Sequence, residues 1–174
     1  MIFNVNPETA PMAIERIYVS PAKGGLQVEQ AAVTVVAGCG IEGDRYFGCA
    51  DEPGQSLSLI EAEEMEAFFR SCGREADFSL SRRNLVTRGV RLNALVGKVF
   101  TVGEVQLRGV ELCEPCLGLG KILSTSAISP AGVVDRFLHR AGLRAEVIAG
   151  GVIARGAEVH VVPGGGMCVS PEGK

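Results

Sequence analysis

The chain has 174 residues, enough for one domain of ordinary size, and 47% are hydrophobic, which allows a core without disulfide bonds. The net charge of −3 argues against general nucleic-acid binding. No apolar run reaches the roughly 18 residues that a membrane-spanning helix needs, so we predict no membrane span. With 23 glycines and only 5% aromatic residues, the composition is typical of β-rich folds with many tight turns.

The cysteines are expected to be reduced thiols. The N-terminal segment lacks the basic and apolar regions of a secretory signal, so we expect a cytoplasmic protein, and disulfides are rare in that compartment. Any special role of a cysteine must therefore come from its local context. The six are Cys39, Cys49, Cys72, Cys113, Cys116 and Cys168.

The first part of the chain is expected to contain two strands and two loops. Residues 13–20 are rich in apolar residues and stop at a proline, which predicts a strand followed by a loop over residues 21–25. A second strand is predicted over residues 28–36, where valine and threonine are frequent before Gly38. Residues 40–48 then form a loop punctuated by glycines.

The rest of the chain predicts one clear helix and several short strands. Apolar residues recur at helical spacing over residues 61–72, acidic residues lie at the start, and a glycine follows the end. A short second helix is predicted over residues 132–140. The predicted strands are 99–102, 105–110, 143–149, 152–154 and 158–162.

Together these elements predict a single, mainly β domain. Many short strands with one or two peripheral helices favour a barrel or a sandwich. The core is expected over residues 13–162, and the glycine-rich tail over residues 163–174 is expected to be frayed.

The sharpest chemical feature is the segment Cys113-Glu114-Pro115-Cys116, which follows a predicted strand. A cysteine on a loop at a strand end can present a soft sulfur ligand while the strands hold the backbone. A structural zinc site normally needs four ligands, and only His139 and His160 could complete this pair. A thioredoxin-like pair would open a helix in a βαβ unit, which we do not predict here. Two buried thiols with a packing role are the remaining alternative.

A second feature is a run of arginines with no acidic residue among them, and this run is unusual in an acidic protein. Guanidinium groups bind phosphate through paired donors, and Asn84 adds an amide that can donate or accept. The alternative is a solvated arginine face whose partners lie elsewhere. The arginines are Arg82, Arg83, Arg88 and Arg91.

Two loops carry further basic residues. Gly43 and Asp44 predict a turn that orients Arg45, although Asp44 and Arg45 could simply pair and brace the loop. Lys23 lies on the loop after the first predicted strand. Either basic residue could meet an anion. The sequence shows neither a serine, histidine and aspartate set at a recognisable elbow nor a phosphate-binding glycine loop, so acyl transfer and nucleotide hydrolysis have no support.

Taken in order, these segments resemble the MOSC domain, which is named after the C-terminal domain of molybdenum cofactor sulfurase. The resemblance spans residues 13–162 and depends on the order and spacing of its pieces more than on any one of them. The matching segments are residues 40–45, 55–57, 82–90, 95–103, 113–116, 142–145 and 150–151.

The resemblance implies a β-barrel that binds molybdopterin as its cofactor. The functional cysteine of this barrel would be Cys116. The equivalent cysteine ligates molybdenum in related proteins such as the mitochondrial amidoxime-reducing component, and it is thought to carry a persulfide in the sulfurase. By similarity, Arg82, Asn84 and Arg45 would contact the cofactor. Two further residues belong to the predicted binding set: Lys23, on a more variable loop, and Arg83, which stands where related reductases often have proline.

Three functions are then open. Cys116 could pass persulfide sulfur to an acceptor, with a cysteine desulfurase as donor, because the chain shows no pyridoxal phosphate site of its own. It could instead ligate molybdenum in a reductase of N-hydroxylated substrates, which would need separate redox partners because no flavin or iron–sulfur signature is present. The third possibility is a non-catalytic module that binds or delivers the cofactor. Cys113 slightly favours sulfur transfer, because a second thiol could resolve a persulfide on Cys116, but it could equally be a packing residue.

Overall fold

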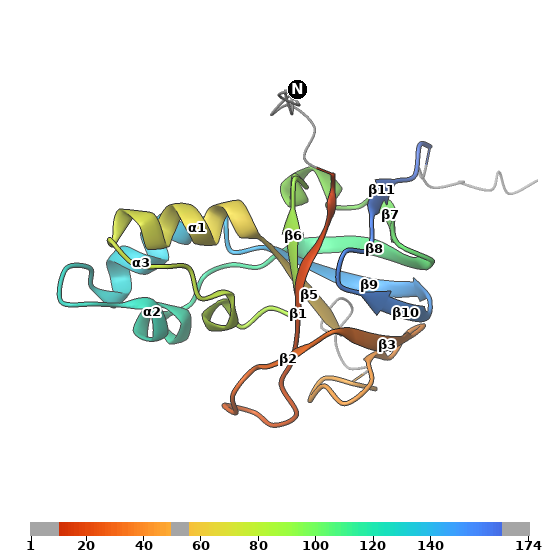
Figure 1. Ribbon diagram of the computed structural model, residues 1–174, viewed down its shortest axis with the longest axis horizontal. Helices are drawn as coiled ribbons and strands as arrows, with labels where there is room; N and C mark the ends of the chain where they lie inside the picture. The colour runs from red at the N-terminus through yellow and green to blue at the C-terminus, as the bar shows by residue number, and fades with distance from the viewer. Residues whose placement is uncertain (1–10, 50–55, 165–174) are drawn as a thin grey trace, which may run out of the picture.

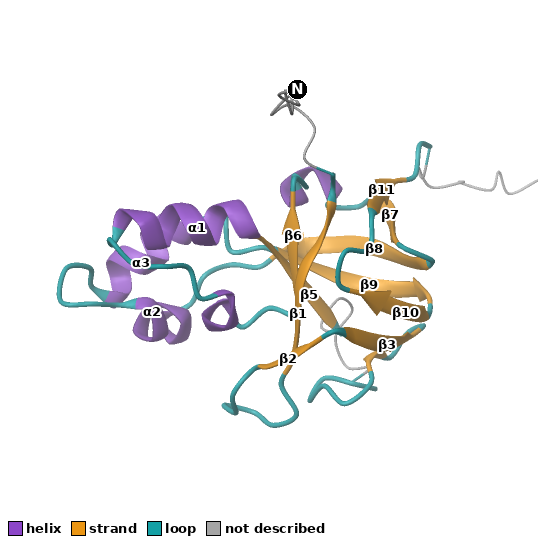
Figure 2. Ribbon diagram, in the orientation of Figure 1, coloured by secondary structure: helices purple, strands orange, loops and turns teal. Residues whose placement is uncertain are grey.

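The computed structural model describes residues 11–49 and 56–164, which form a mainly β structure with three α-helices. In Figure 2 the three α-helices gather at one end of the molecule and most of the strands lie at the other. The predicted tail lies outside the described residues from position 165 onward, as do Gln55 and Cys168. No helix of the described part is long and apolar enough to cross a membrane.

Most strands belong to one sheet of eight, in the order β11-β7-β8-β9-β5-β6-β1-β2, and three others form a small sheet in the order β10-β3-β4. The larger sheet contains β1 (Ala13–Val19), β2 (Val28–Gln30), β5 (Leu57–Glu61), β6 (Leu85–Arg88), β7 (Val99–Val102), β8 (Val105–Leu112), β9 (Leu143–Ala149) and β11 (Val159–Val161). The smaller sheet contains β3 (Ala32–Val36), β4 (Gly40–Ile41) and β10 (Gly151–Ala154).

The centre of the larger sheet is a parallel pair, β5 and β6, and the other pairings are antiparallel. Helix α1 (Ala62–Ser71) connects the two parallel strands, as a crossover between parallel strands requires. Leu59 and Ile60 are both fully buried although they are neighbours, so β5 is covered on both faces. The βαβ unit was not predicted from the sequence.

The helix predicted over residues 61–72 is confirmed as α1, one residue shorter at each end. The second predicted helix is α3 (Pro130–Phe137), which begins earlier than expected because the Ser129 side chain accepts from Gly132 N and Pro130 occupies the first turn. It also ends earlier, and His139 has a φ of 60°. Helix α2 (Leu117–Leu123) was not predicted, nor were the short 3-10 helices η1 (Phe78–Ser81) and η2 (Leu92–Leu95).

The apolar side chains form two cores. One lies among the strands and contains fully buried residues such as Ile17, Leu59 and Phe100. The other lies where the three helices meet the sheet, and it includes Phe69 of α1 and Phe137 of α3. Figure 1 shows α1, α2 and α3 packed side by side at one end, away from β7–β10. The helical core therefore covers the sheet around β5 and β6.

The closed barrel expected for the fold is not confirmed. The outer strands of the larger sheet, β2 and β11, do not pair with each other in the described residues. The start of β1 does meet the segment before β11, where an isolated bridge joins Ala13 to Glu158 and Ile14 N donates to Ala157 O at 2.9 Å. The strand predicted over residues 28–36 is also divided, since β2 pairs with β1 and β3 pairs with β10.

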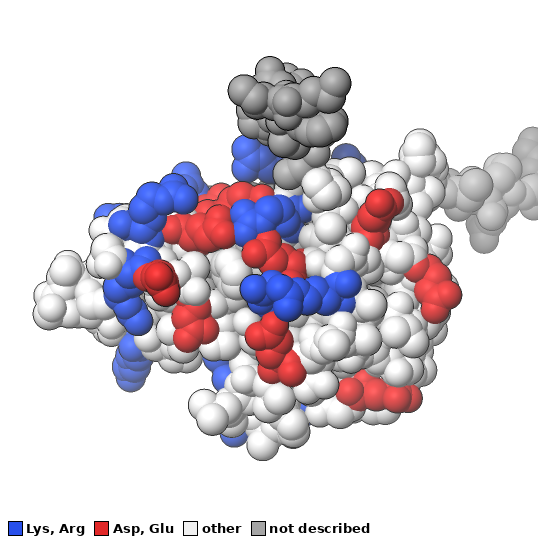
Figure 3. Space-filling model, viewed as in Figure 1, with Lys and Arg blue, Asp and Glu red and all other residues white. Residues whose placement is uncertain are grey.

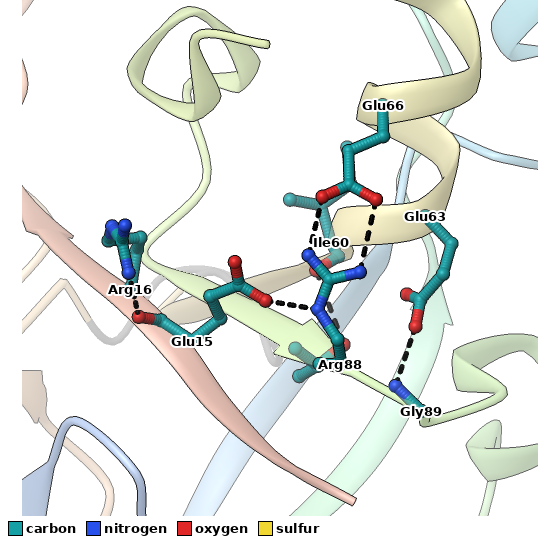
Figure 4. A network of polar contacts seen from close by, with 8 residues as sticks. Glu15, Arg16, Ile60, Glu63, Glu66, Arg88 and Gly89 are labelled. Carbon is teal, nitrogen blue, oxygen red and sulfur yellow. Dashed lines mark hydrogen bonds and ion pairs between the residues drawn. The ribbon is translucent and has the colours of Figure 1, made fainter. Parts of the chain in front are cut away.

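Acidic and basic side chains lie close together over β1 on the face shown in Figure 3. In the network of Figure 4, Arg88 of β6 bonds both carboxylate oxygens of Glu66 on α1, at 2.5 and 3.0 Å. Its Nε donates to Glu15 of β1. Arg88 therefore ties three elements together, and this bidentate pairing lowers the pKa of Glu66 below its ordinary value.

Replacing Arg88 with methionine is expected to lower the free energy of unfolding by about 1–3 kcal/mol, because two partly buried carboxylates lose their partner. The pKa of Glu66 is lower in the folded than in the unfolded protein. Its contribution is therefore complete above about pH 4.3 and is lost as the pH falls through the lower folded value. Urea unfolding between pH 3 and 7 (roughly the range in which carboxylates titrate) should show the difference between wild type and R88M shrinking in acid. A constant difference would contradict this account.

Candidate functional site

Four arginines line one small pocket of about 130 Å³ at the junction of the sheet and the helical end. They come from three separate stretches: the loop after β4, the residues after η1 (two of the arginines) and β9. The pocket also contains a buried thiol. Its lining residues are Arg45, Tyr46, Leu57, Ser58, Arg82, Arg83, Cys113 and Arg144.

Backbone and side-chain contacts hold the arginines in place. Arg82 follows η1 with a φ of 62°, a left-handed conformation that non-glycine residues seldom adopt, and donates from Nη1 to Gly25 O at 2.6 Å. Arg83 donates from Nε to Ala141 O at 2.9 Å. The guanidinium of Arg45 lies over the ring of Tyr46, 4.5 Å from its centroid.

Asp44 connects the loops around this pocket. Its Oδ2 accepts from Ser20 N at 3.0 Å and from Asn84 Nδ2 at 3.1 Å, and its Oδ1 accepts from Tyr46 N at 3.1 Å. Asp44 is 6% exposed. It forms no ion pair with Arg45 within the described residues, so the simple pairing considered from the sequence is wrong. Asp44 positions the loop, and Arg45 is left for another partner.

The residues that line the pocket include four arginines and no carboxylate, although the nearby Asp44 acts electrostatically on Arg82. Within residues 11–49 and 56–164, no carboxylate forms an ion pair with Arg45, Arg82 or Arg83, whereas Arg144 has Glu111 at 3.4 Å. Burial and the neighbouring charge of Arg45 lower the pKa of Arg82. Like charges held together in a partly buried site favour a bound anion, and this arrangement is suited to a phosphate or a similar oxyanion.

The two cysteines of the predicted motif lie in different environments. Cys113 is 3% exposed and lines the pocket, its backbone N bonded to Gly142 O at 2.8 Å. Burial raises the pKa of its thiol, and Arg83 and Arg144 oppose that rise. Cys116 is exposed, caps the N-terminus of α2 and is not among the pocket-lining residues. The thiol in the pocket is therefore that of Cys113.

The other residues of the predicted binding set are placed differently. Asn84 is buried, and its amide is engaged within the protein: Nδ2 donates to Tyr18 O and to Asp44, and Oδ1 accepts from Ser58 N and Oγ. Its observed contacts position the loops and leave the amide no free group for a cofactor. Lys23 is exposed on the loop after β1 and does not line the pocket.

The arginine run of the sequence is divided by the fold. Arg82 and Arg83 reach the pocket, but Arg88 is paired with Glu15 and Glu66, and Arg91 is exposed with its Nη1 3.9 Å from Glu61. The prediction of one four-arginine cluster is therefore wrong.

Several residues that line the pocket were not predicted to do so from the sequence, among them Arg144, Tyr46, Ser58 and Cys113. Arg144 was part of a segment that resembled the MOSC domain, which was the one signal for it. Nothing local distinguishes an arginine in an alternating strand from any other solvent-facing side chain. The position of Ser58 depends on the pairing of β5 with β6 and β9, which was not predicted.

A larger cavity of about 470 Å³ lies nearby, but its charges are mixed. Arg91 faces Glu61 at 3.9 Å, and Arg140 faces Glu64 at 3.8 Å. His139 lines the same cavity. Because each arginine there has a carboxylate partner, the smaller pocket is the better anion site despite its size.

No group of three or more histidine, cysteine, aspartate or glutamate side chains in the described part of the chain could hold a metal ion.

The family model described as MOSC domain matches residues 48–160 of this chain. The chain therefore belongs to the MOSC domain family, a class of domains associated with the molybdenum cofactor. A comparison with curated protein sequences found no match.

Solved structures show the same fold. The YuaD protein from Bacillus subtilis is 19% identical with a TM-score of 0.74, and the match covers 87% of this chain and 96% of that one. YiiM from Geobacillus stearothermophilus is 17% identical with a TM-score of 0.69, covering 87% and 75% of the two chains. YiiM from Escherichia coli is 20% identical with a TM-score of 0.63, covering 88% and 70%.

The pocket fits one part of a molybdopterin. A volume of about 130 Å³ corresponds to a few water molecules of about 30 Å³ each, which suits a phosphate. Arg45, Arg82 and Arg83 have the donors that a phosphate requires.

Proposed function

We propose that the protein binds the molybdenum cofactor through its phosphate and acts through Cys116 in sulfur transfer or cofactor metabolism. The main support is the convergence of Arg45, Arg82 and Arg83 on one pocket, with no carboxylate paired to them in the described residues. Membership of the MOSC family supports the choice of cofactor over other phosphate-bearing ligands.

In this proposal each group has a distinct task. Arg82 and Arg83 hold the phosphate, Arg45 approaches from the opposite loop, and Lys23 adds a more distant positive charge. Cys116 is exposed and can receive sulfur from a protein donor such as a cysteine desulfurase. The cofactor, when bound, supplies a thiophilic molybdenum centre.

Arg82→Ala is expected to weaken cofactor binding by about tenfold or more, because a charge-assisted hydrogen bond contributes roughly 1.5–3 kcal/mol. The measurement is the released pterin per chain after expression in a host that makes the cofactor, together with phosphate binding by calorimetry. Arg91→Ala is the matched control, since Arg91 belongs to the same run of sequence but lies outside the pocket. Equal losses in both variants would remove the pocket from the proposal.

Cys116→Ser separates the possible reactions. Stoichiometric molybdenum that disappears in this variant would support metal ligation and a reductase of N-hydroxylated substrates, which must then turn over a hydroxylamine or an amidoxime with supplied redox partners. A persulfide on Cys116 after exposure to a desulfurase, without metal loss in the variant, supports sulfur transfer. Retained pterin with neither result supports a binding or delivery module.

A further inference from the structure

The two thiols of the Cys113–Cys116 segment are suited to different halves of one transfer. Cys116 is exposed at the start of α2, where a donor protein can reach it. Cys113 is 3% exposed and lines the arginine pocket, where a large donor cannot enter the space of about 130 Å³. Thus the accessible sulfur is outside the pocket, and the sulfur inside the pocket is inaccessible.

Resting on the proposed function, we propose that the two cysteines form a sulfur relay, in which Cys116 takes sulfur at the surface and Cys113 receives it in the pocket. The Cys116 thiolate first attacks the outer sulfur of a donor persulfide, R–S–SH, forming Cys116–S–SH and releasing the donor thiolate R–S⁻. The Cys113 thiolate then attacks the outer sulfur of Cys116–S–SH. One S–S bond forms and one breaks, giving Cys113–S–SH and the free Cys116 thiolate, with no oxidant or reductant consumed, and Cys113–S–SH then releases its proton to become Cys113–S–S⁻.

The short spacing makes the second step feasible. Three residues of chain span at most about 10–11 Å, and residues 113–116 lie in neither a helix nor a strand except for the cap of α2. The exposed side chain of Cys116 can change rotamer without disturbing the core. A reaction between two groups of the same chain also gains from a high effective concentration.

The environment of Cys113 favours receiving sulfur from inside the protein rather than from solution. Cys113 is only 3% exposed, so a soluble donor has little access to its sulfur, whereas Cys116 is three residues away in the same chain. Burial also raises its thiol pKa. Arg83 and Arg144 lie close enough to oppose that rise and to stabilise the anionic product of the transfer. Once loaded, Cys113 faces the same pocket as Arg45, Arg82 and Arg83, which have no ion-pair partner in the described part of the chain, and therefore any anion that they hold.

The test is to expose the full chain to glutathione persulfide, trap it with an alkylating reagent over time and locate the added sulfur by peptide mass spectrometry. Fragmentation before Pro115 separates the two cysteines within one peptide. In the wild type, sulfur should appear first on Cys116 and then on Cys113. In Cys116→Ser, loading of Cys113 should slow by about tenfold or more, the amount expected when an intramolecular route is lost. Cys72→Ser, at the C-cap of α1 and outside the pocket, should behave as the wild type.

Three results would overturn the relay. One is loading of Cys113 at an unchanged rate in Cys116→Ser, which would mean direct access. Another is a wild type in which Cys116 carries sulfur but Cys113 never does; this leaves the proposed function of Cys116 standing. If Cys116 itself never carries sulfur while pterin binding depends on Arg82, both the relay and the sulfur-transfer function are wrong, and cofactor binding survives. Because the key variant changes an exposed side chain, it is expected to fold normally.

Discussion

Replacing Gly142 with alanine is expected to lower the free energy of unfolding by about 4 kcal/mol or more. A β-carbon at this position would lie 1.9 Å from the carbonyl oxygen of Leu59 and 3.0 Å from its carbonyl carbon. Gly142 also has a φ of 105°, a conformation that side chains other than glycine rarely adopt. The obstructing atoms belong to the backbone of β5, so no side-chain rotation can relieve the contact.

The damage should extend to the site. Leu59 pairs with Leu143 in the β5–β9 ladder, and Gly142 O accepts from Cys113 N, so a shift of Gly142 displaces the segment that carries the pocket thiol. Gly156→Ala is the matched control, because its φ is 86° but no atom lies within 4 Å of the added carbon. It should cost only the conformational strain, about 1–2 kcal/mol. Urea unfolding of both variants measures the difference, and equal losses would show that strain, not close approach, decides the outcome.

Local patterns predicted the parts of the fold that depend on local interactions. Helix α1 was recognised because its apolar residues, its acidic start and the following glycine all agree. Strands β5 and β6 were missed because their residues are buried in succession and show no alternation. Helix α2 contains Gly118 and Gly120, which lower helix propensity. Gly120 is required there by packing, since a β-carbon would lie 2.5 Å from Pro130 O of α3.

The sequence predicted only those parts of the candidate site whose residues are chemically distinctive and lie close together in the chain. Arg82 and Arg83 were predicted to bind an anion because a run of arginines is unusual in an acidic chain. The same run includes Arg88, which does not line the pocket. Arg88 lies at the end of β6, where its partners on β1 and α1 come from distant parts of the sequence. The resemblance to the MOSC domain directed attention to Cys116, whereas only the structure reveals that Cys113 faces the pocket. The ion pairs of Arg88 and the burial of Cys113 depend on contacts between distant parts of the chain, which no local sequence pattern encodes.

Replacing Asp44 with alanine is expected to reduce both stability, by about 3–5 kcal/mol, and anion affinity, by about tenfold or more. The carboxylate is buried and is the common acceptor for donors from three loops: Ser20 N, Tyr46 N and Asn84 Nδ2. The bonds from Ser20 N and Asn84 Nδ2 are buried, and a buried donor left without an acceptor costs about 1–3 kcal/mol. The bond from Tyr46 N is partly buried and adds less. The loops would then be free to move apart, and Arg45 and Arg82 would lose the spacing that an oxyanion requires.

Charge alone predicts the opposite effect on binding, which makes the experiment decisive. The negative charge of Asp44 acts on Arg82, so its removal makes the pocket more positive and should by itself tighten anion binding. Asp44→Asn removes the charge and keeps the shape of the side chain. The amide nitrogen of the new asparagine would still face at least one donor, from which it cannot accept a hydrogen bond. Asp135→Ala, an exposed position on α3, controls for net charge. Phosphate calorimetry should therefore rank Asp44→Ala as the weakest binder. Tighter binding in that variant would mean that Asp44 tunes the field of the pocket and does not position its arginines.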